Sequence, residues 1–357
     1  MALSLLSAKD LPALIMRVLI RADTRPENAE LVANALIRAE LDGLPSHGVM
    51  RVPYHAEQVK RGRVDGWAIP RVTRAAPSVI RIDAQHGFAY PAIAAGLQAV
   101  VDAVAETGVG VVAIGRSHHS GVAGHHVKDL ASRGLVPVMF TNNCARISAP
   151  GGRRPRFGTN PIAFACPRPR KPPLVVDLSM TVVAAGKIVM AARQGDRIPA
   201  GWAYDAQGVP TCDAETALTG SMAPIGGTKG AALALVVEIL AAALTGSQFS
   251  FEAASEFGLG DGPLYSMGQV ILAIDPLRLG PIAFFERIEM LCSEGRACIV
   301  LCSINALVSF RHRCGILLGY RQSYQPDPLD NRGSYALRWS RKHLVRGFSN
   351  DSGLLWF

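Results

Sequence analysis

The sequence lacks the cysteine patterns that mark disulfide scaffolds and common metal sites. Its seven cysteines form an odd set without CxxC spacing, and four of them are crowded into residues 292–314. Such a set is typical of reduced thiols, so we expect a cytoplasmic chain. HExxH spacing is also missing, and the doublets His118-His119 and His125-His126 have no carboxylate among them. We therefore predict no metal site.

Long apolar runs are missing as well. The longest run, Ala231–Leu244, is shorter than a membrane span and is interrupted by Glu238. The N-terminal 23 residues lack the basic region and cleavage site of a signal peptide and read as an amphipathic helix. We expect neither a leader nor a membrane segment.

The composition nevertheless provides a core. Apolar residues make up 49% of the 357 positions and charged residues 18%, which excludes wholesale disorder. The formal charge is +9, of which residues 294–357 carry +5. The remaining +4 mildly favours anionic ligands. The basic C-terminal stretch contains no recognition motif for nucleic acid, so we expect no nucleic-acid partner.

Hydrophobic periodicity predicts an α/β chain, in which helices alternate with short buried strands. A GxGxxA match begins at Gly108, but it follows an expected helix and precedes an expected strand. A Rossmann loop has the opposite order, so a glycine-rich turn is the better interpretation. The predicted helices are 24–43, 92–105, 122–131 and 229–244, and the predicted strands are 79–82, 109–114, 136–141, 162–166, 174–176 and 270–274.

Residues 46–51, SHGVMR, have the content of a proton-transfer and carboxylate site. Histidine has the free pKa nearest to neutrality, and the Ser46 hydroxyl could orient the His47 ring. Arg51 follows four residues later, and arginine binds a carboxylate through a planar fork. If a helical turn follows Gly48, both side chains point to one side. The alternative is a capped loop with both residues on the surface.

Two further segments could face an anionic ligand. Gly226–Gly230 (GGTKG) precedes an expected helix, where backbone N–H groups and Lys229 favour a phosphate or carboxylate. A tight turn with a surface lysine is the alternative. Asp177 follows an apolar run, and either accepts hydrogen bonds from a ligand or caps the next helix. Residues 158–161 (GTNP) form a turn in which Thr159 offers a hydroxyl.

Together these segments resemble the malate/L-lactate dehydrogenase family, which is distinct from the Rossmann lactate and malate dehydrogenases. The resemblance implies a non-Rossmann NAD(P)-binding fold, with a mixed sheet and flanking helices, and a homodimer. It also implies hydride transfer between NAD or NADP and a C2 carbonyl or imine beside a carboxylate. It spans roughly residues 5–293 and is carried by SHGVMRVPYHAEQVKRGRV, GRSHHSGVAGHH, APGGRRPRFGTNPIAFACP, VVDLS, GGTKGAALALVVEILAAALTG and GQVILAIDP.

The resemblance also assigns roles to residues. It implies that His47 is the proton donor with Ser46 as its relay partner, and that Arg51 and Thr159 hold the substrate carboxylate. In the ureidoglycolate branch of the family, the position of His119 is the acid/base and that of Asn143 contacts substrate, so both are second choices. The residues implied to line NAD(P) are His119, Ser120, Gly121, Val122, Ala123, Asp177, Leu178, Ser179, Thr228 and Lys229.

The implied reaction is hydride transfer between NAD(P)H and the C2 carbonyl of a small 2-oxo acid, as in malate or (S)-lactate dehydrogenases. One alternative is a reductase of the cyclic imines Δ1-piperideine-2-carboxylate and Δ1-pyrroline-2-carboxylate. Another is an inactive ligand-binding remnant.

Three regions are expected along the chain. Residues 1–75 form a helical region that carries the Ser-His-Gly motif and packs with the substrate domain, and residues 76–293 form the NAD(P)- and substrate-binding body. Residues 294–357 lose the amphipathic periodicity and are either an ordinary extension or a frame-shifted tail. The family usually has a PGER-like segment that completes the cofactor site. None follows Glu294, which favours the second interpretation.

Overall fold

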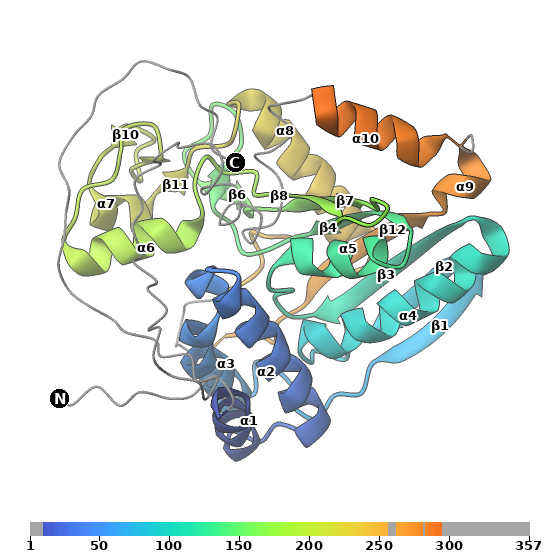
Figure 1. Cartoon of the computed structure of the whole chain (residues 1–357). Coiled ribbons are helices and arrows are strands. Elements are labelled where there is room, and N and C mark those ends of the chain that lie inside the picture. Colours follow the sequence, from blue (N-terminus) through green and yellow to red (C-terminus); the bar gives the residue numbers. More distant parts are fainter. Residues whose placement is uncertain (1–9, 256–261, 281–282, 295–357) are drawn as a thin grey trace, which may run out of the picture.

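The computed structural model describes residues 10–255, 262–280 and 283–294 (Figure 1). The prediction of a frame-shifted tail concerns residues 294–357, and all of these except residue 294 lie outside the described ranges. Among the described residues, no helix has both the length and the apolar character needed to span a membrane.

The N-terminal part of the chain is helical, and its helices share a small core. Ile15 and Leu19 of the first helix are buried against Val32 and Leu36 of the second. The second helix begins at Pro26, where a missing N–H costs nothing. The elements are α1 (Leu11–Arg21), α2 (Pro26–Leu41), the 3₁₀ turns η1 (Pro45–His47) and η2 (Val49–Arg51), and α3 (Val52–Lys60).

A seven-stranded mixed sheet, with strand order β1-β2-β3-β12-β4-β7-β8, forms the centre of the molecule. β2 and β3 are parallel and are connected through a helix, whereas the other neighbours are antiparallel. The predicted mixed sheet with flanking helices is confirmed. The strands are β1 (Arg71–Ala76), β2 (Val79–Asp83), β3 (Val109–Ser117), β4 (Val136–Thr141), β7 (Ile162–Cys166), β8 (Leu174–Leu178) and β12 (Met267–Ile274).

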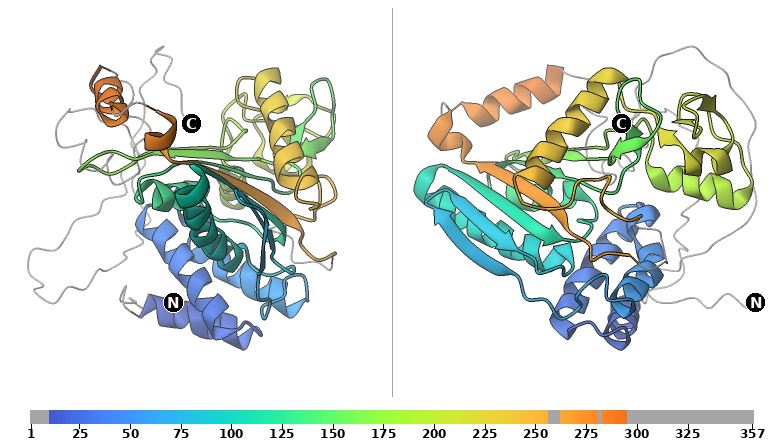
Figure 2. Two further views of the ribbon diagram at one scale, coloured as in Figure 1. Left: turned by 90° about the vertical axis from the view of Figure 1, so that its right-hand side faces the viewer. Right: turned by 180° about the vertical axis from the view of Figure 1, so that it is seen from behind.

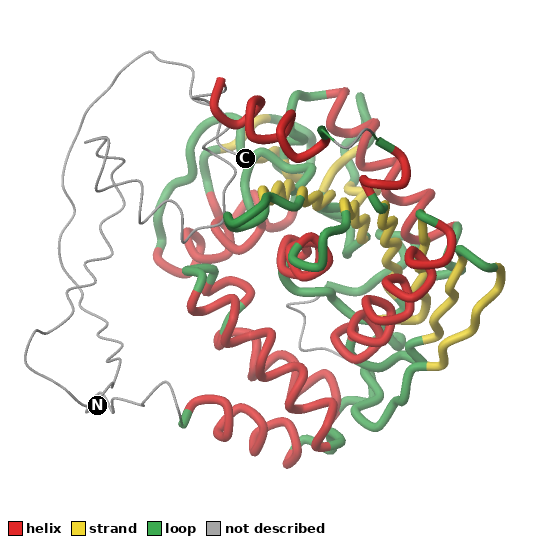
Figure 3. The backbone as a smooth tube through the Cα atoms, turned by 45° about the vertical axis from the view of Figure 1, so that its right-hand side comes forward, coloured by secondary structure: helices red, strands yellow, loops and turns green. Residues whose placement is uncertain are grey.

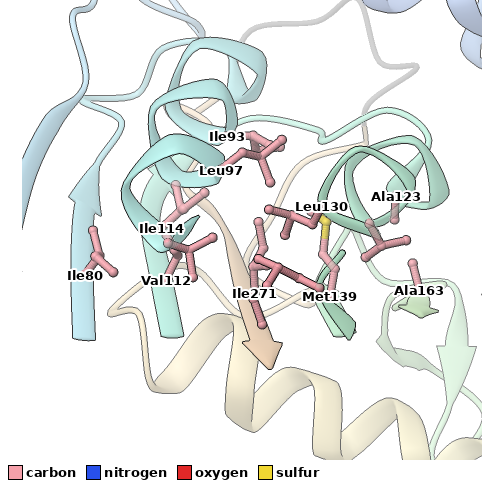
Figure 4. Close-up of a cluster of buried hydrophobic side chains, with 14 of the residues drawn as sticks. Ile80, Ile93, Leu97, Val112, Ile114, Ala123, Leu130, Met139, Ala163 and Ile271 are labelled. Carbon is pink, nitrogen blue, oxygen red and sulfur yellow. The ribbon is translucent and has the colours of Figure 1, made fainter. Parts of the chain in front are cut away.

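Helices cover both faces of this sheet (Figure 2, Figure 3). α4 (Ala89–Thr107) and α5 (Ala123–Ala131) lie on one face, and the helix from residue 228 to 243 lies on the other. Leu97 of α4 and Leu130 of α5 pack against the buried strand residue Ile271 (Figure 4). This apolar layer is the main core of the protein.

Gly108 ends α4 in the left-handed conformation, with φ 79°, and β3 starts at the next residue. The GxGxxA segment therefore leads from a helix into a strand, and the prediction that it is not a Rossmann loop is confirmed.

A polar clamp fastens the N-terminal helices to this body. Arg38 of α2 donates to both carboxylate oxygens of Asp129 in α5, at 2.8 and 2.9 Å. Nearby, His125 Nε2 of α5 lies 2.9 Å from a carboxylate oxygen of Asp42, the residue that follows α2. The two contacts set the position of α2 relative to the sheet.

A second sheet of five short strands, in the order β10-β9-β11-β5-β6, lies beside the first. Its helices have a core of their own, which includes Ile188, Ile198 and Met222. Strands of two or three residues show no hydrophobic period, so none of the strands of this sheet is among the elements predicted from the sequence. The remaining elements are β5 (Ile147–Ser148), β6 (Pro155–Phe157), α6 (Ala185–Gln194), β9 (Ala203–Tyr204), β10 (Pro210–Thr211), α7 (Ala214–Thr219), β11 (Ser221–Met222), α8 (Thr228–Val237), the π-helix η3 (Glu238–Ala243), α9 (Pro276–Leu279) and α10 (Phe284–Glu294).

Candidate active site

The two 3₁₀ turns fold the Ser-His-Gly segment back on itself. Gly48 stands between them, and any side chain there would collide with the Glu40 carboxylate of α2. Val49 N donates to that carboxylate at 3.0 Å. Arg51 is thereby brought beneath the start of the segment, where its Nε donates to the carbonyl oxygen of Ser46 at 2.7 Å. Because Arg51 is only 5% exposed, the surface-loop alternative is wrong for this residue.

Ser46, His47 and His119 come together from separate parts of the chain. Ser46 Oγ lies 3.0 Å from His47 Nδ1. The His47 ring faces the His119 ring of the β3–α5 loop, with 5.6 Å between ring centroids. The first turn of α6 closes the side of this pair, since a Cβ at Gly186 would lie 3.1 Å from Ser46 Cβ.

His119 is held as a neutral ring. Gly121 N donates to its Nδ1 at 3.0 Å, which assigns the ring proton to Nε2. Burial, the Arg51 cation and the neighbouring His47 hold the pKa of His119 well below its ordinary value. At neutral pH this ring has no second proton to give.

The other histidines of the doublets have separate surroundings. His118 is packed edge-on against the rings of His55, Phe88 and Tyr265. His125 contacts Asp42 as described above, and His126 Nε2 donates to the carbonyl of Ser120 at 2.8 Å. Of the four, His119 is the one whose ring lies beside His47, with the two ring planes tilted by 33°.

Asp177 links β8 to the start of α5. Its carboxylate accepts a hydrogen bond from Gly124 N at 2.7 Å, so it caps α5, and the prediction that it could cap the next helix is wrong. The side chain reaches solvent, yet desolvation of the carboxyl by the surrounding protein atoms raises the pKa of Asp177 to about 6, against the lowering effect of the Gly124 N–H. An acid that titrates there can accept hydrogen bonds from a ligand at neutral pH.

The segment after β8 lies beside the N-terminus of α8. Ile225 N donates to the carbonyl of Met180 at 2.9 Å, which brings Leu178 and Ser179 close to the turn before α8. Gly226 and Gly227 have φ of 61° and 64° and open space where a Cβ would stand. Thr228 and Lys229 are exposed just beyond them.

These residues fit a dinucleotide. Two open glycines at a helix N-terminus, followed by a lysine, form a cradle for a phosphate group. At α5, Gly121 has φ 71°, and Ser120 Oγ donates to Thr141 Oγ1 at 3.4 Å. Val122 is the N-cap of α5, and Ala123 is its first residue.

Thr159 and Asn143 are joined through Asn160. Met180 N donates to the carbonyl of Thr159 at 2.7 Å, which fastens the 158–161 turn to β8. Asn143 N donates to Asn160 Oδ1 at 3.4 Å, and the Asn143 side chain accepts from Cys144 N at 2.8 Å.

Tyr90, which was not predicted from the sequence as a site residue, packs against the β3–α5 loop that carries His119. A Cβ at Gly121 would lie 2.6 Å from the Tyr90 hydroxyl oxygen, so the phenol packs directly on the β3–α5 loop. Burial raises the pKa of Tyr90 to about 12, although the nearby Arg51 cation opposes this. In the sequence Tyr90 begins an apolar helix, and nothing distinguishes it there from a core residue.

The fold and this arrangement are shared with known proteins. The family model for malate/L-lactate dehydrogenase matches residues 6–301. The chain belongs to the malate/L-lactate dehydrogenase family. It is therefore an oxidoreductase that uses NAD or NADP. The family predicted from the sequence is confirmed.

Two curated relatives illustrate the range of the family. The (2R)-3-sulfolactate dehydrogenase (NADP(+)) of Chromohalobacter salexigens is 49% identical over 263 residues, which cover 74% of this chain and 78% of the relative. The Δ1-pyrroline-2-carboxylate/Δ1-piperideine-2-carboxylate reductase of Pseudomonas syringae pv. tomato is 38% identical over 282 residues, covering 79% and 82%.

Solved structures of both kinds have this fold. The Δ1-piperideine-2-carboxylate reductase from Pseudomonas syringae pv. tomato superposes with a TM-score of 0.76 at 36% identity, covering 82% of this chain and 90% of that one. The sulfolactate dehydrogenase from Methanocaldococcus jannaschii has a TM-score of 0.73 at 29% identity, covering 82% and 84%.

Proposed function

We propose that this enzyme reduces the C2 carbonyl of a small 2-oxo acid, and oxidises the corresponding 2-hydroxy acid in the reverse direction. The observation that carries the proposal is the compact Ser46–His47–Arg51 unit. It brings a histidine suited to donate a proton and an arginine suited to bind a carboxylate together within six residues of chain, opposite His119. NAD(P)H, when bound, supplies the hydride.

His47 acts as the general acid. As the acid, His47 is the doubly protonated ring: its Nδ1–H donates to Ser46 Oγ, and its Nε2 proton passes to the substrate oxygen as negative charge develops there, which leaves the neutral ring. Ser46 fixes the orientation of the His47 ring and is its relay partner in proton transfer. His119 is disfavoured as the acid because its pKa is lowered so far that it stays neutral.

Arg51 and Thr159 hold the substrate carboxylate. The Arg51 guanidinium is anchored through Nε, and its planar fork suits a two-oxygen partner. Fixing the carboxylate fixes the adjacent C2 atom, which converts the reaction into an oriented, effectively intramolecular step. Asn143 is a further substrate contact in this proposal.

Three segments would hold the cofactor. They are Ser120 to Ala123, which lead into α5, Asp177 to Ser179, and Thr228 with Lys229. The two helix N-termini and Lys229 favour its phosphates.

Cyclic imines are the second candidate substrates. This alternative is favoured by the structural similarity to the Δ1-piperideine-2-carboxylate reductase at a TM-score of 0.76. The sulfolactate dehydrogenase relative, at 49% identity, instead favours a 2-hydroxy acid, and it adds 3-sulfopyruvate to the substrates worth testing.

The test is NADH and NADPH oxidation with pyruvate, oxaloacetate, 3-sulfopyruvate, Δ1-piperideine-2-carboxylate and Δ1-pyrroline-2-carboxylate. We expect the highest kcat/KM for an open-chain 2-oxo acid. His47→Asn should nearly abolish this turnover, and His86→Asn is its matched control. His86 has φ 60°, which asparagine tolerates, and its ring bonds to the Tyr265 carbonyl. A preference for the cyclic imines would replace the first proposal with the second.

We also propose that the enzyme is a homodimer, and α8 with η3 supports this. From residue 231 to 244 this helix is apolar except for the buried Glu238, yet Leu233, Val236 and Ile239 are exposed. A helix of this kind is normally buried, and a second copy would cover it. Light scattering after size exclusion should give twice the chain mass, and Val236→Glu should give a monomer. A monomeric wild-type protein would refute the proposal.

A further inference from the structure

Glu238 is the one charged side chain in the apolar stretch from residue 231 to 244, and it is only 3% exposed. It stands where α8 changes from α-helix to the π-helix η3. Single π-helical turns are frequent near functional sites, because the wider turn redirects a side chain. The sequence marks this residue as an interruption of an apolar run without revealing what it faces.

The Glu238 carboxylate binds residues from two distant segments. It accepts from Asn160 Nδ2 at 2.7 Å and from Ser250 N at 3.0 Å, and Ser250 Oγ also donates to it. Asn160 Nδ2 donates as well to the carbonyl of Ala234 at 2.9 Å, one turn earlier in α8. Asn160 is fully buried, so these bonds replace water.

Through Asn160 the same carboxylate reaches the candidate substrate residues. Asn160 has φ 39°, a conformation that a non-glycine residue keeps only when its surroundings hold it there. It directly follows Thr159, and its Oδ1 accepts from Asn143 N at 3.4 Å. A side chain at Gly158 would collide with both the Asn143 carbonyl and Asn160 Oδ1, so this turn lies tightly on Asn143.

We propose that Glu238 is a positioning residue for substrate binding: by fixing Asn160, it sets the places of Thr159 and Asn143 together. This inference rests on the proposed function, in which those two residues contact the substrate. Glu238 itself touches no substrate in this account, and it acts through one amide side chain.

Glu238→Gln tests the idea with little change in volume. The glutamine amide puts a donor where the carboxylate accepted, so Asn160 Nδ2 or a Ser250 donor loses its partner. A buried donor left without an acceptor costs enough free energy to change a binding constant by about tenfold or more. We expect KM for the 2-oxo acid to rise by about that factor, with kcat changing less and the NAD(P)H Kd unchanged.

Val237→Ala is the matched control, because it removes fully buried atoms from the neighbouring position without altering Asn160. It should lower Tm and leave KM unchanged. If Glu238→Gln does not fold, Ser250→Ala removes one donor to the carboxylate and should raise KM in the same direction. A KM increase in Val237→Ala equal to that in Glu238→Gln, or an unchanged KM in both Glu238→Gln and Ser250→Ala, overturns the inference.

Hydrogen exchange on the same variants separates this inference from the proposed function. If the wild-type enzyme turns over none of the five substrates, the proposed function fails, and the positioning claim is judged on exchange alone. Faster exchange in residues 141–145 and 158–161 of Glu238→Gln, absent from Val237→Ala, supports positioning. Equal exchange in the two variants overturns it.

Discussion

Replacing Arg51 with lysine isolates the geometry of carboxylate binding from its charge. Lysine keeps the positive charge but has no planar fork and no Nε–H at the position that now donates to the Ser46 carbonyl. Two interactions are therefore lost: the anchor beneath the Ser-His-Gly segment, and one arm of the proposed two-oxygen contact.

The size of the effect follows from these two losses. A hydrogen bond that involves a charged group contributes about 1.5–3 kcal/mol. Loss of one carboxylate arm should thus raise KM for the 2-oxo acid by about 10- to 150-fold. The lost anchor leaves the Ser46 carbonyl without its Arg51 donor, which should lower Tm, whereas the NAD(P)H Kd should stay constant.

Initial rates of NAD(P)H oxidation over a range of substrate concentrations provide KM and kcat, and a fluorescence titration provides the cofactor Kd. Arg74→Lys is the control, since Arg74 is exposed on β1 and pairs with Glu106 at 2.6 Å, away from the site. An unchanged KM in Arg51→Lys, alongside an unaffected Arg74→Lys, would show that Arg51 is purely structural.

Three further changes have defined outcomes. His47→Asn should lower kcat by about 10²- to 10⁴-fold and leave the NAD(P)H Kd unchanged, because proton transfer alone is lost; near-normal turnover would transfer the acid role to His119. Burial and Arg38 lower the pKa of His125 to about 4. As the pH falls from 6.5 to about 4, His125 therefore binds a proton in the unfolded chain but not in the folded chain. Urea denaturation should show stability falling through that window and less so in His125→Asn, and equal pH profiles would contradict this. Gly121→Ala, strained at φ 71° and crowded by Tyr90, should weaken cofactor binding by about tenfold, measured by titration.

Much of the large sheet could be predicted from the sequence because its strands are long enough to show a pattern. Residues 136–141 and 162–166 form strands with the predicted bounds, and α4 extends a few residues beyond its prediction at both ends. The small sheet could not be predicted, because its strands of two or three residues are defined by their partners. Parallel pairing of Met222 with Ile147 spans a separation that no local pattern reveals.

The same division applies to the candidate site. Ser46, His47 and Arg51 lie within six residues of one another, so their spacing already indicated a joint role. The approach of His119 to His47 depends on how the N-terminal helices dock onto the body. Asn160 meets Glu238 across 78 positions, and only the folded chain brings the amide to the carboxylate.

The clamp between α2 and α5 makes catalysis sensitive to docking as well as to folding. His47 lies in the helical part and His119 in the β3–α5 loop of the body, so the distance between their rings depends on how the two parts are docked. A molecule with an intact sheet and loosened helices would keep the proposed cofactor residues of α5, β8 and α8, but His47, the proposed proton donor, would no longer be held beside them. With the proposed roles, such a molecule would bind NAD(P)H without oxidising it. Warming that separates Arg38 from Asp129 and His125 from Asp42 would then abolish turnover at a temperature below that at which the core unfolds.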